Sequence, residues 1–320
     1  MHPLARALLS AWEVRPVILL VLLTFGTLYC LGWLRLRRQS TQQKLASKLR
    51  LASYLSGLGI VALALMSPID RLGSQLFFMH MVQHMLFMML AAPLLWLAEP
   101  FPFVLWGMPA PARHVVGGFF TRESTFRRVL AKATAPGISW LLFVTIYLGW
   151  HDSDAYNAAL YYDWVHDIQH ITFFGAAMLW WWPIIGAAPH IHGRFPAWAK
   201  LPYIIGTIPP NMAVGVSIAF ATDVRYTYYE SIPRFWGFTV MQDQQLSGAI
   251  MWIVGSMMFI MTALVVLALL FIKEKERPGA VTPDWDSDDA MIAPGLEDRV
   301  TQKRWHEVAK ASSTDLSQPT

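Results

Sequence analysis

The sequence predicts an all-α membrane protein, a polytopic bundle of seven transmembrane helices. Of its 320 residues, 55% are hydrophobic and only 14% are charged, whereas soluble domains contain about 25% charged residues. The charges are also clustered, which leaves uncharged windows of about the 20 residues that a helix needs to cross a bilayer core. These two observations favour a multi-pass protein of a lipid bilayer over a soluble domain.

Seven apolar segments are expected to cross the membrane. They lie at about residues 16–34, 51–69, 74–98, 136–150, 165–188, 202–222 and 246–272. The first segment follows Arg6 and Arg15, as the apolar core of a signal peptide would. It is too long for a typical signal, and no small-residue cleavage site follows it, so we expect it to be retained. Residues 1–15 are then a short outer N-terminus, and residues 16–272 form the membrane domain.

The distribution of basic residues predicts the orientation of the spans. The first connection is basic and contains no acidic residue; it carries Arg35, Arg37, Arg38, Lys44, Lys48 and Arg50. The positive-inside rule places this connection, and every second one after it, in the cytoplasm, so the chain is expected to run N-out and C-in. Residues 273–320 are acidic and rich in Pro and Ser, which is typical of a disordered cytoplasmic tail. Topology and anionic lipid account for the basic residues without nucleic acid as a partner.

Two pairs of histidines have the same spacing in different predicted spans. His80 and His84 begin the third span, and His166 and His170 begin the fifth. Residues four apart share one face of a helix, so both members of a pair can reach one centre. Both spans start at the outer side, which puts the pairs at a similar depth. Polar groups at membrane depth are costly to bury and usually functional; we therefore predict that the pairs form two walls of one site.

Four further residues are candidates for this site. His151 ends the fourth span on the outer side, and Asp243 enters the seventh span from that side. Met81 and Met88 flank the histidine face of the third span. We expect His151 or Asp243 at the mouth of the site and the two thioethers beside the imidazoles.

The predicted ligands favour copper. Imidazole and thioether without thiolate suit copper, in particular Cu(I). Zinc suits imidazole nearly as well, and a haem held by one histidine from each pair is a further alternative. The only cysteine, Cys30, provides neither a disulfide framework nor a CxxC site.

Several motifs resemble the caa3-type cytochrome c oxidase assembly factors, a family of multi-span bacterial membrane proteins. The matching segments are 79–85, 92–95, 151–159, 166–170, 179–183 and 243–245, with Gly248 and Trp252. The similarity covers about residues 50–272. It implies a non-enzymatic protein of the bacterial plasma membrane that delivers copper to, or stabilises, a nascent cytochrome c oxidase subunit, with a periplasmic copper donor as a second partner.

Two other functions remain as alternatives. A copper carrier or permease would need a polar path from the site toward the cytoplasm, but the third and fifth spans continue mainly with Leu, Phe, Met and Trp. A bis-histidine haem protein would use one histidine of each pair and leave the other without a role.

Overall fold

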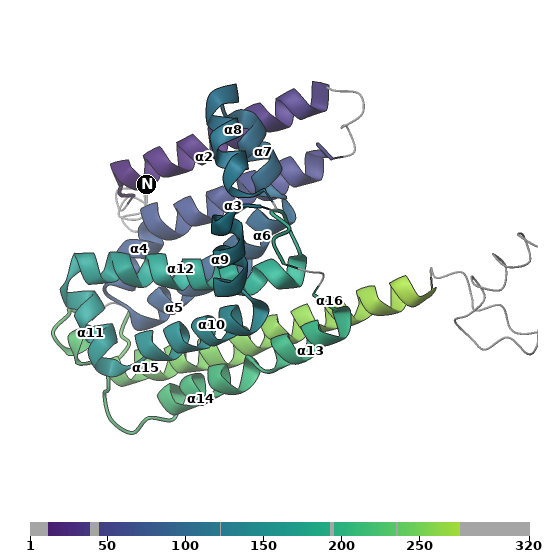
Figure 1. Cartoon of the computed structure of the whole chain (residues 1–320). Coiled ribbons are helices and arrows are strands. Elements are labelled where there is room, and N and C mark those ends of the chain that lie inside the picture. Colours follow the sequence, from purple (N-terminus) through teal and green to yellow (C-terminus); the bar gives the residue numbers. More distant parts are fainter. Residues whose placement is uncertain (1–11, 39–44, 122, 193–194, 235, 276–320) are drawn as a thin grey trace, which may run out of the picture. The chain divides into compact units, whose positions relative to one another are not determined.

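The computed structural model of the chain describes residues 12–38, 45–121, 123–192, 195–234 and 236–275. All regular structure in these ranges is helical, so the predicted all-α fold is confirmed (Figure 1). The helices are α2 (Pro16–Arg38), α3 (Lys48–Met66), α4 (Pro68–Gly73), α5 (Phe77–Met85), η2 (Leu86–Ala91), α6 (Ala92–Leu97), α7 (Pro100–Gly107), α8 (Ala110–Phe119), α9 (Thr125–Ala133), α10 (Pro136–Trp150), α11 (Ser153–Tyr161), α12 (Asp163–Ile185), α13 (Ala197–Ile205), α14 (Ile208–Ala219), η3 (Thr227–Glu230), α15 (Val240–Ala249), η4 (Ile250–Gly255) and α16 (Ser256–Lys275).

Five helical stretches in the described part of the chain are long and apolar enough to cross a membrane. They are Pro16–Arg38, Lys48–Met66, Phe77–Leu97, Ala197–Ala219 and Val240–Ile272. A sixth results if α9 and α10, which meet at an angle of 55°, are counted as one broken span. The chain is therefore a multi-pass membrane protein, as predicted, and its described residues contain five or six candidate spans.

The predicted fifth span corresponds to α12, which is not among these candidates. The helix has 23 residues, a length sufficient to cross a bilayer. Its first turns, however, carry polar and charged side chains, namely His166, Asp167, Gln169 and His170. These residues lower the mean hydropathy of α12. Two of them, His166 and His170, are candidates for the predicted metal site.

Helix ends and loops fall into two groups, each joined by its own hydrogen bonds and ion pairs. One group is joined by the pairs Arg15–Asp70, Tyr229–Gly73, Tyr226–His151 and Phe77–Asp243. The other is joined by the pairs Ala188–Glu99, Arg127–His190 and Lys200–Ile184. Helix α12 begins in the first group, where Asp167 lies 3.5 Å from Arg15, and it ends in the second at Ile184.

Three short helices, α7, α8 and α9, occupy residues 99–135, the connection between the predicted third and fourth spans. Helix α7 crosses α2 in backbone contact, because a Cβ atom on Gly32 or Gly107 would overlap the main chain of the other helix. Helix α9 is amphipathic: Phe126 and Val129 are exposed next to the basic residues Arg127 and Arg128. Helices of this kind are too short to cross a bilayer and typically lie at its surface.

The helices of the predicted sixth and seventh spans also approach each other through glycines. A Cβ atom on Gly248 of α15 would lie 2.7 Å from the carbonyl oxygen of Gly215 in α14. Below this contact the backbone widens into the π-helical segment η4. The amide of Asn211 donates to the Met251 carbonyl at 3.1 Å and thereby satisfies a backbone group of η4. Small residues and side-chain amides are the usual means of joining helices in a membrane.

The chain divides into two compact units, Met1–Val266 and Leu267–Thr320. The first contains every helix up to the middle of α16. Of the second, the structure describes only residues 267–275, the last turns of that helix. The predicted disordered tail therefore lies outside the described residues, apart from its first three positions, which are helical.

Asp243 connects the seventh predicted span to the third. Its carboxylate accepts hydrogen bonds from the backbone N–H groups of Phe77 and Phe78, both at 3.0 Å, at the beginning of α5. It also pairs with Arg234 at 2.8 Å. Only 1% of Asp243 is exposed. A buried carboxylate with three donors is held in place, and it fixes the start of the helix that carries His80 and His84.

We expect replacement of Asp243 by Ala to destabilise the protein. The change leaves two buried amides and a guanidinium without their acceptor, and loss of one partner of a buried ion pair costs about 3–5 kcal/mol. Thermal unfolding of the purified protein in detergent measures the effect. Asp223→Ala is the matched control, since Asp223 is exposed and its carboxylate bonds only to Thr222. Unfolding of Asp243→Ala at the wild-type temperature would contradict this role.

Candidate metal centre

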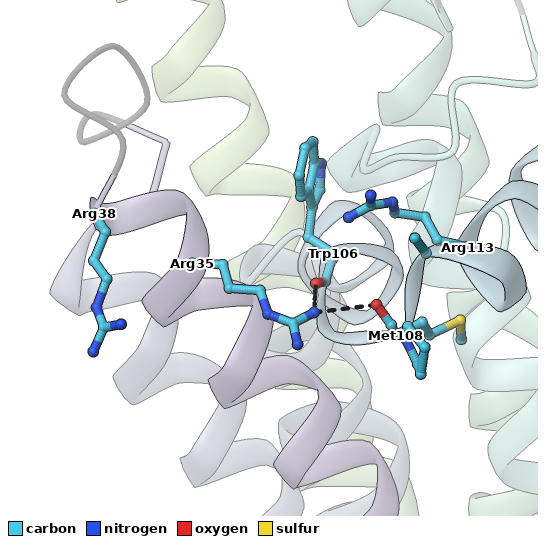
Figure 2. Close-up of a pocket in the computed structure, with 7 residues that line it drawn as sticks. Arg35, Arg38, Trp106, Met108 and Arg113 are labelled. Carbon is cyan, nitrogen blue, oxygen red and sulfur yellow. Dashed lines mark hydrogen bonds between the residues drawn. The ribbon is translucent and has the colours of Figure 1, made fainter.

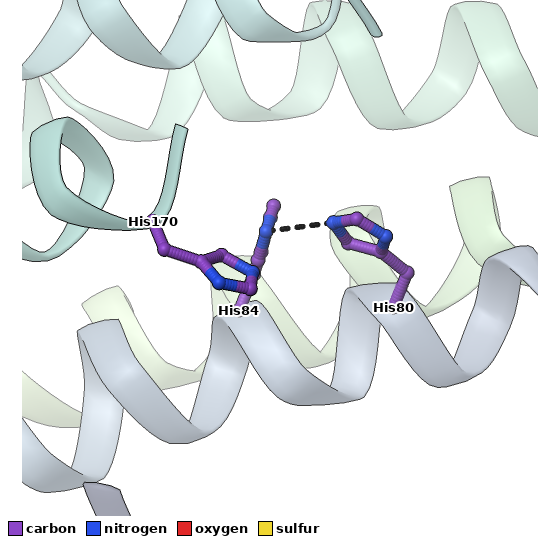
Figure 3. Close-up of side chains that lie close together, drawn as sticks. All are labelled: His80, His84 and His170. Atoms are coloured by element: carbon purple, nitrogen blue, oxygen red, sulfur yellow. Dashed lines mark hydrogen bonds between the residues drawn. The ribbon is translucent and has the colours of Figure 1, made fainter. Parts of the chain in front are cut away.

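Three buried histidines from two helices come together in the structure. His80 and His84 extend from α5, and His170 approaches them from α12 (Figure 3). Each offers one ring nitrogen that lies within 4.8 Å of the other two, a spacing suited to one metal ion. Their exposed fractions are 0%, 2% and 6%. The structure thus brings together three of the four histidines of the two pairs.

The closest nitrogens are the Nε2 atoms of His80 and His84, 2.9 Å apart. In this arrangement one imidazole donates a hydrogen bond to the other. Metal–nitrogen bonds of about 2.0–2.1 Å place neighbouring ligand nitrogens roughly 3.3–3.6 Å apart. A small rotation of either ring would provide this separation, so the pair is close to the geometry that a metal requires.

Buried polar atoms without a hydrogen-bond partner are concentrated around these histidines. Among the described residues, such side-chain atoms belong to residues 80–84, to residues 166–170 and to Arg234. They include the Nδ1 atom of His84 and both ring nitrogens of His170. Native structures pair the large majority of their buried polar groups, so a cluster of unpaired ones is typical of a site that binds a further ligand such as an ion.

The surroundings of the three rings are mainly aromatic. The ring centroid of Tyr156 lies 5.1 Å from His80, that of Phe173 lies 4.5 Å from His84, and that of Phe87 lies 5.4 Å from His170. Among the described residues, no carboxylate belongs to this group of three candidate ligands. The site therefore offers uncharged nitrogen ligands in a shell that excludes most water.

Helix α5 is also anchored by Gln83, which lies between the two histidines in the sequence. Its amide nitrogen donates to the Ala64 carbonyl at 2.8 Å and to the Asp70 carboxylate at 2.7 Å. Asp70 also pairs with Arg15 at 2.8 Å. Burial raises the pKa of the Asp70 carboxyl, and the positive charge of Arg15 opposes that shift. These contacts fix the rotation of α5 about its axis and so direct its histidine face toward α12.

A second anchor lies just below the histidines, where α5 continues as the π-helical segment η2 (Leu86–Ala91). The indole nitrogen of Trp181 in α12 donates to the Met88 carbonyl at 2.7 Å. This hydrogen bond joins the two helices that provide the ligands. Single π-helical turns occur frequently at functional sites.

The fourth histidine of the two pairs, His166, lies beside the group. Its ring centroid is 4.2 Å from that of His170 and 5.3 Å from that of His80. His151 is farther away, because Phe173 lies between it and His84. Its Nδ1 atom donates to the Tyr147 carbonyl at 2.6 Å, and its Nε2 atom takes no part in this hydrogen bond. His166 is adjacent to the three ligands, whereas the structure does not bring His151 into the group.

The remaining candidates are buried but are not part of the group of three. Both carboxylate oxygens of Asp243 are engaged by the α5 amides, and one also by Arg234. Met81 and Met88 are about 1–2% exposed and belong to the main hydrophobic core. Their role as ligands stays a prediction.

Sequence spacing did not identify the residues that hold the site in place. Gln83 and Asp70 are 13 positions apart on different helices, and Trp181 is 93 positions from Met88. The one available signal was the Gln that precedes the second histidine in both pairs, at Gln83 and Gln169. Both amides are fully buried, although only Gln83 has the anchoring contacts described above.

Comparisons with known proteins identify a family. The family of cytochrome c oxidase caa3 assembly factors matches residues 27–272. Uncharacterised proteins of Mycobacterium bovis and Mycobacterium tuberculosis are each 25% identical over 273 residues, which is 84% of this chain and 40% of theirs. A Mycobacterium leprae protein is 25% identical over 248 residues, 76% of this chain and 37% of its own.

The chain therefore spans about two-fifths of the length of the curated relatives that it matches. No solved structure matches it. The family match extends from the second half of α2 to the end of the last candidate span and includes all the histidines of the site. The chain belongs to the cytochrome c oxidase caa3 assembly factor family.

Proposed function

We propose that the protein binds a copper ion among His80, His84 and His170 and delivers it to a nascent subunit of a cytochrome c oxidase. The observation that carries this proposal is the group of three buried imidazoles, each of which offers one ring nitrogen within 4.8 Å of the other two. Family membership supplies the link to oxidase assembly. In this role copper is cargo, and the protein is a chaperone rather than an enzyme.

The charge balance of the site favours Cu(I) over a divalent metal. Three neutral imidazoles leave the full charge of the ion uncompensated, and the cost of burying an uncompensated charge is large. A monovalent ion reduces that cost. Zn²⁺ usually occupies sites with four ligands, often including thiolates or carboxylates, and neither is present in the group of three. His166 is the nearest additional imidazole, and we assign it as an auxiliary ligand.

Weak ligation suits a protein that must release its metal. Imidazoles lack the negative charge of thiolates, so copper is exchanged more readily to a receiving site. The position of the histidines near the loop ends that contain Gly73, His151 and Tyr229 favours transfer at that end of the bundle. A periplasmic copper donor and the oxidase subunit are the partners that this direction of transfer requires.

We expect the purified protein to bind Cu(I), and His84→Ala and His170→Ala to weaken binding. Loss of a supporting group around a metal typically lowers affinity about 10–100-fold, and loss of a direct ligand should cost at least as much. Competition with a chromophoric Cu(I) chelator under anaerobic conditions measures the affinity. His166→Ala should have a smaller effect than either variant.

His114→Ala is the matched control for this experiment, because His114 is exposed on α8. It should bind copper as the wild type does. Equal affinities of wild type and His84→Ala would contradict the site. A Soret band in the spectrum of the purified protein would instead identify haem as the ligand, and preferential retention of zinc would identify zinc.

We further expect deletion of the gene to lower cytochrome c oxidase activity and the copper-to-haem ratio of the purified oxidase. Wild type and His114→Ala should restore both quantities, whereas His84→Ala combined with His170→Ala should not. If the double variant restores the oxidase fully, the protein assists assembly without carrying copper. If deletion leaves the oxidase unchanged, the proposal that the protein takes part in oxidase assembly is wrong as well.

We also propose seven spans with the N-terminus outside and the C-terminus in the cytoplasm. The two groups of loop contacts support this topology, because α12 begins in one group and ends in the other. The basic residues Arg35, Arg113 and Arg127 belong to segments on the second side, which the positive-inside rule assigns to the cytoplasm. Localisation in the plasma membrane follows from the proposed exchange of copper with the oxidase.

Single cysteines test the topology in a Cys30→Ala background. Asp154→Cys and Ser231→Cys should react with a membrane-impermeant thiol reagent in intact cells, and Thr121→Cys only after permeabilisation. All three positions are exposed. Asp154 and Ser231 lie on either side of α12 and the sixth predicted span along the chain. Labelling of these two positions from opposite sides would show that one of the two helices does not cross the membrane.

A further inference from the structure

An open pocket of about 440 Å³ lies where the C-terminal turn of α2 meets the loop between α7 and α8. Arg35, Arg38 and Arg113 line it, together with Trp106 and the first residues of α8 (Figure 2). No acidic side chain is among its lining residues. None of the histidines of the metal site lines this pocket.

Arg35 is held in place by the end of α7. One guanidinium nitrogen donates to the carbonyl oxygens of Trp106, Gly107 and Met108 at 2.7–3.1 Å. These contacts use a single nitrogen, Nη1, and fix the plane of the group. The other donors of a guanidinium so oriented remain suited to bidentate binding of a phosphate or carboxylate.

Arg113 stacks on the indole of Trp106. Its guanidinium carbon is 4.3 Å from the centroid of the Trp106 ring, a cation–π contact (Figure 2). Stacking restrains the side chain without consuming its hydrogen-bond donors. Within the described part of the chain, none of the three arginines forms an ion pair. Three positive charges therefore meet at one pocket without a counter-charge.

The start of α8 adds to the positive potential. The helix begins at Ala110, has no side-chain cap and has no acidic residue in its first turn. The N–H groups at the start of a helix attract anions. The arginines supply the charge. Because Pro109 and Pro111 have no N–H, this helix end adds only the N–H groups of Ala110 and Ala112.

Apolar residues next to the pocket indicate the kind of anion. Leu31 and Leu34 precede Arg35 and Arg38 by one helical turn, on the same side of α2, and are 40% and 45% exposed. Val115 and Phe119 are exposed on α8. A soluble anion would make no use of these side chains, whereas lipid acyl chains would cover them. Basic pockets at the end of membrane helices typically bind lipid headgroups.

We propose that this pocket binds the phosphodiester headgroup of an anionic phospholipid. The phosphate lies between Arg35, Arg38 and Arg113, and the acyl chains extend along Leu31 and Leu34 of α2. The bound lipid joins α2 to the α7–α8 loop. This site is independent of copper, because it shares no residue with the histidine group.

Native mass spectrometry of the full-length protein in detergent tests the proposal. Dioleoylphosphatidylglycerol should be retained and dioleoylphosphatidylcholine should not. Arg38→Gln combined with Arg113→Gln should weaken phosphatidylglycerol binding about 30-fold, since each surface arginine contributes about 1 kcal/mol to anionic lipid binding. Arg35 is left unchanged because it also supports α7.

The matched control is Arg128→Gln combined with Lys132→Gln, which removes the same charge from exposed positions on α9. This variant should bind phosphatidylglycerol as the wild type does. Unchanged helical circular dichroism and gel filtration of both double variants show that the fold is intact.

Several results would overturn the proposal. Equal retention of the two lipids, or equal loss in both double variants, would show that the pocket does not select the headgroup. Inorganic phosphate that displaces phosphatidylglycerol at an equal concentration would indicate a soluble anion as the ligand. If the lipid binds only after Asp284, Asp286, Asp288 and Asp289 are replaced by Asn, the acidic tail occupies the pocket instead.

Discussion

The hydrogen bonds between the Asp243 carboxylate and the first amides of α5 are the constraint on which the site depends. They join the last predicted span to the helix that carries His80 and His84. Helix termini leave their first N–H groups without an internal partner, and in a membrane protein water cannot always supply one. A carboxylate fixed by Arg234 satisfies them and thereby sets where α5 begins and the level of its histidines.

The histidine site contrasts with the rest of the buried polar side chains. Asn211 and Thr207 link neighbouring helices and have hydrogen-bond partners for their functional groups. The histidine segments instead retain buried nitrogens without partners. Each such atom costs free energy in the absence of a ligand. Among the described residues, the unpaired buried side-chain atoms gather at the two histidine segments, apart from one nitrogen of Arg234, and this concentration is what a metal-binding role requires.

Much of the site was predictable because helical periodicity is a local property. The spacing of each pair is enough to place both members on one face, and matched depth followed from the order of the spans. Prediction did not extend to the contacts of Asp243. Its position at the entry of the seventh span suggested a place at the mouth of the site, whereas its oxygens bond to α5 and Arg234. Nor did prediction find α7, since eight residues containing prolines resemble a loop in sequence.

The sequence by itself determined the class of the protein, the helical positions of both histidine pairs and the family resemblance, because composition, spacing and motifs depend on neighbouring residues alone. Only the tertiary structure decided which imidazoles meet. The rotation of α5 is set by Gln83 and Asp70 and its distance from α12 by Trp181, contacts between residues far apart in the chain. For that reason His80, His84 and His170 form the group, His166 lies beside it, and His151 does not join it.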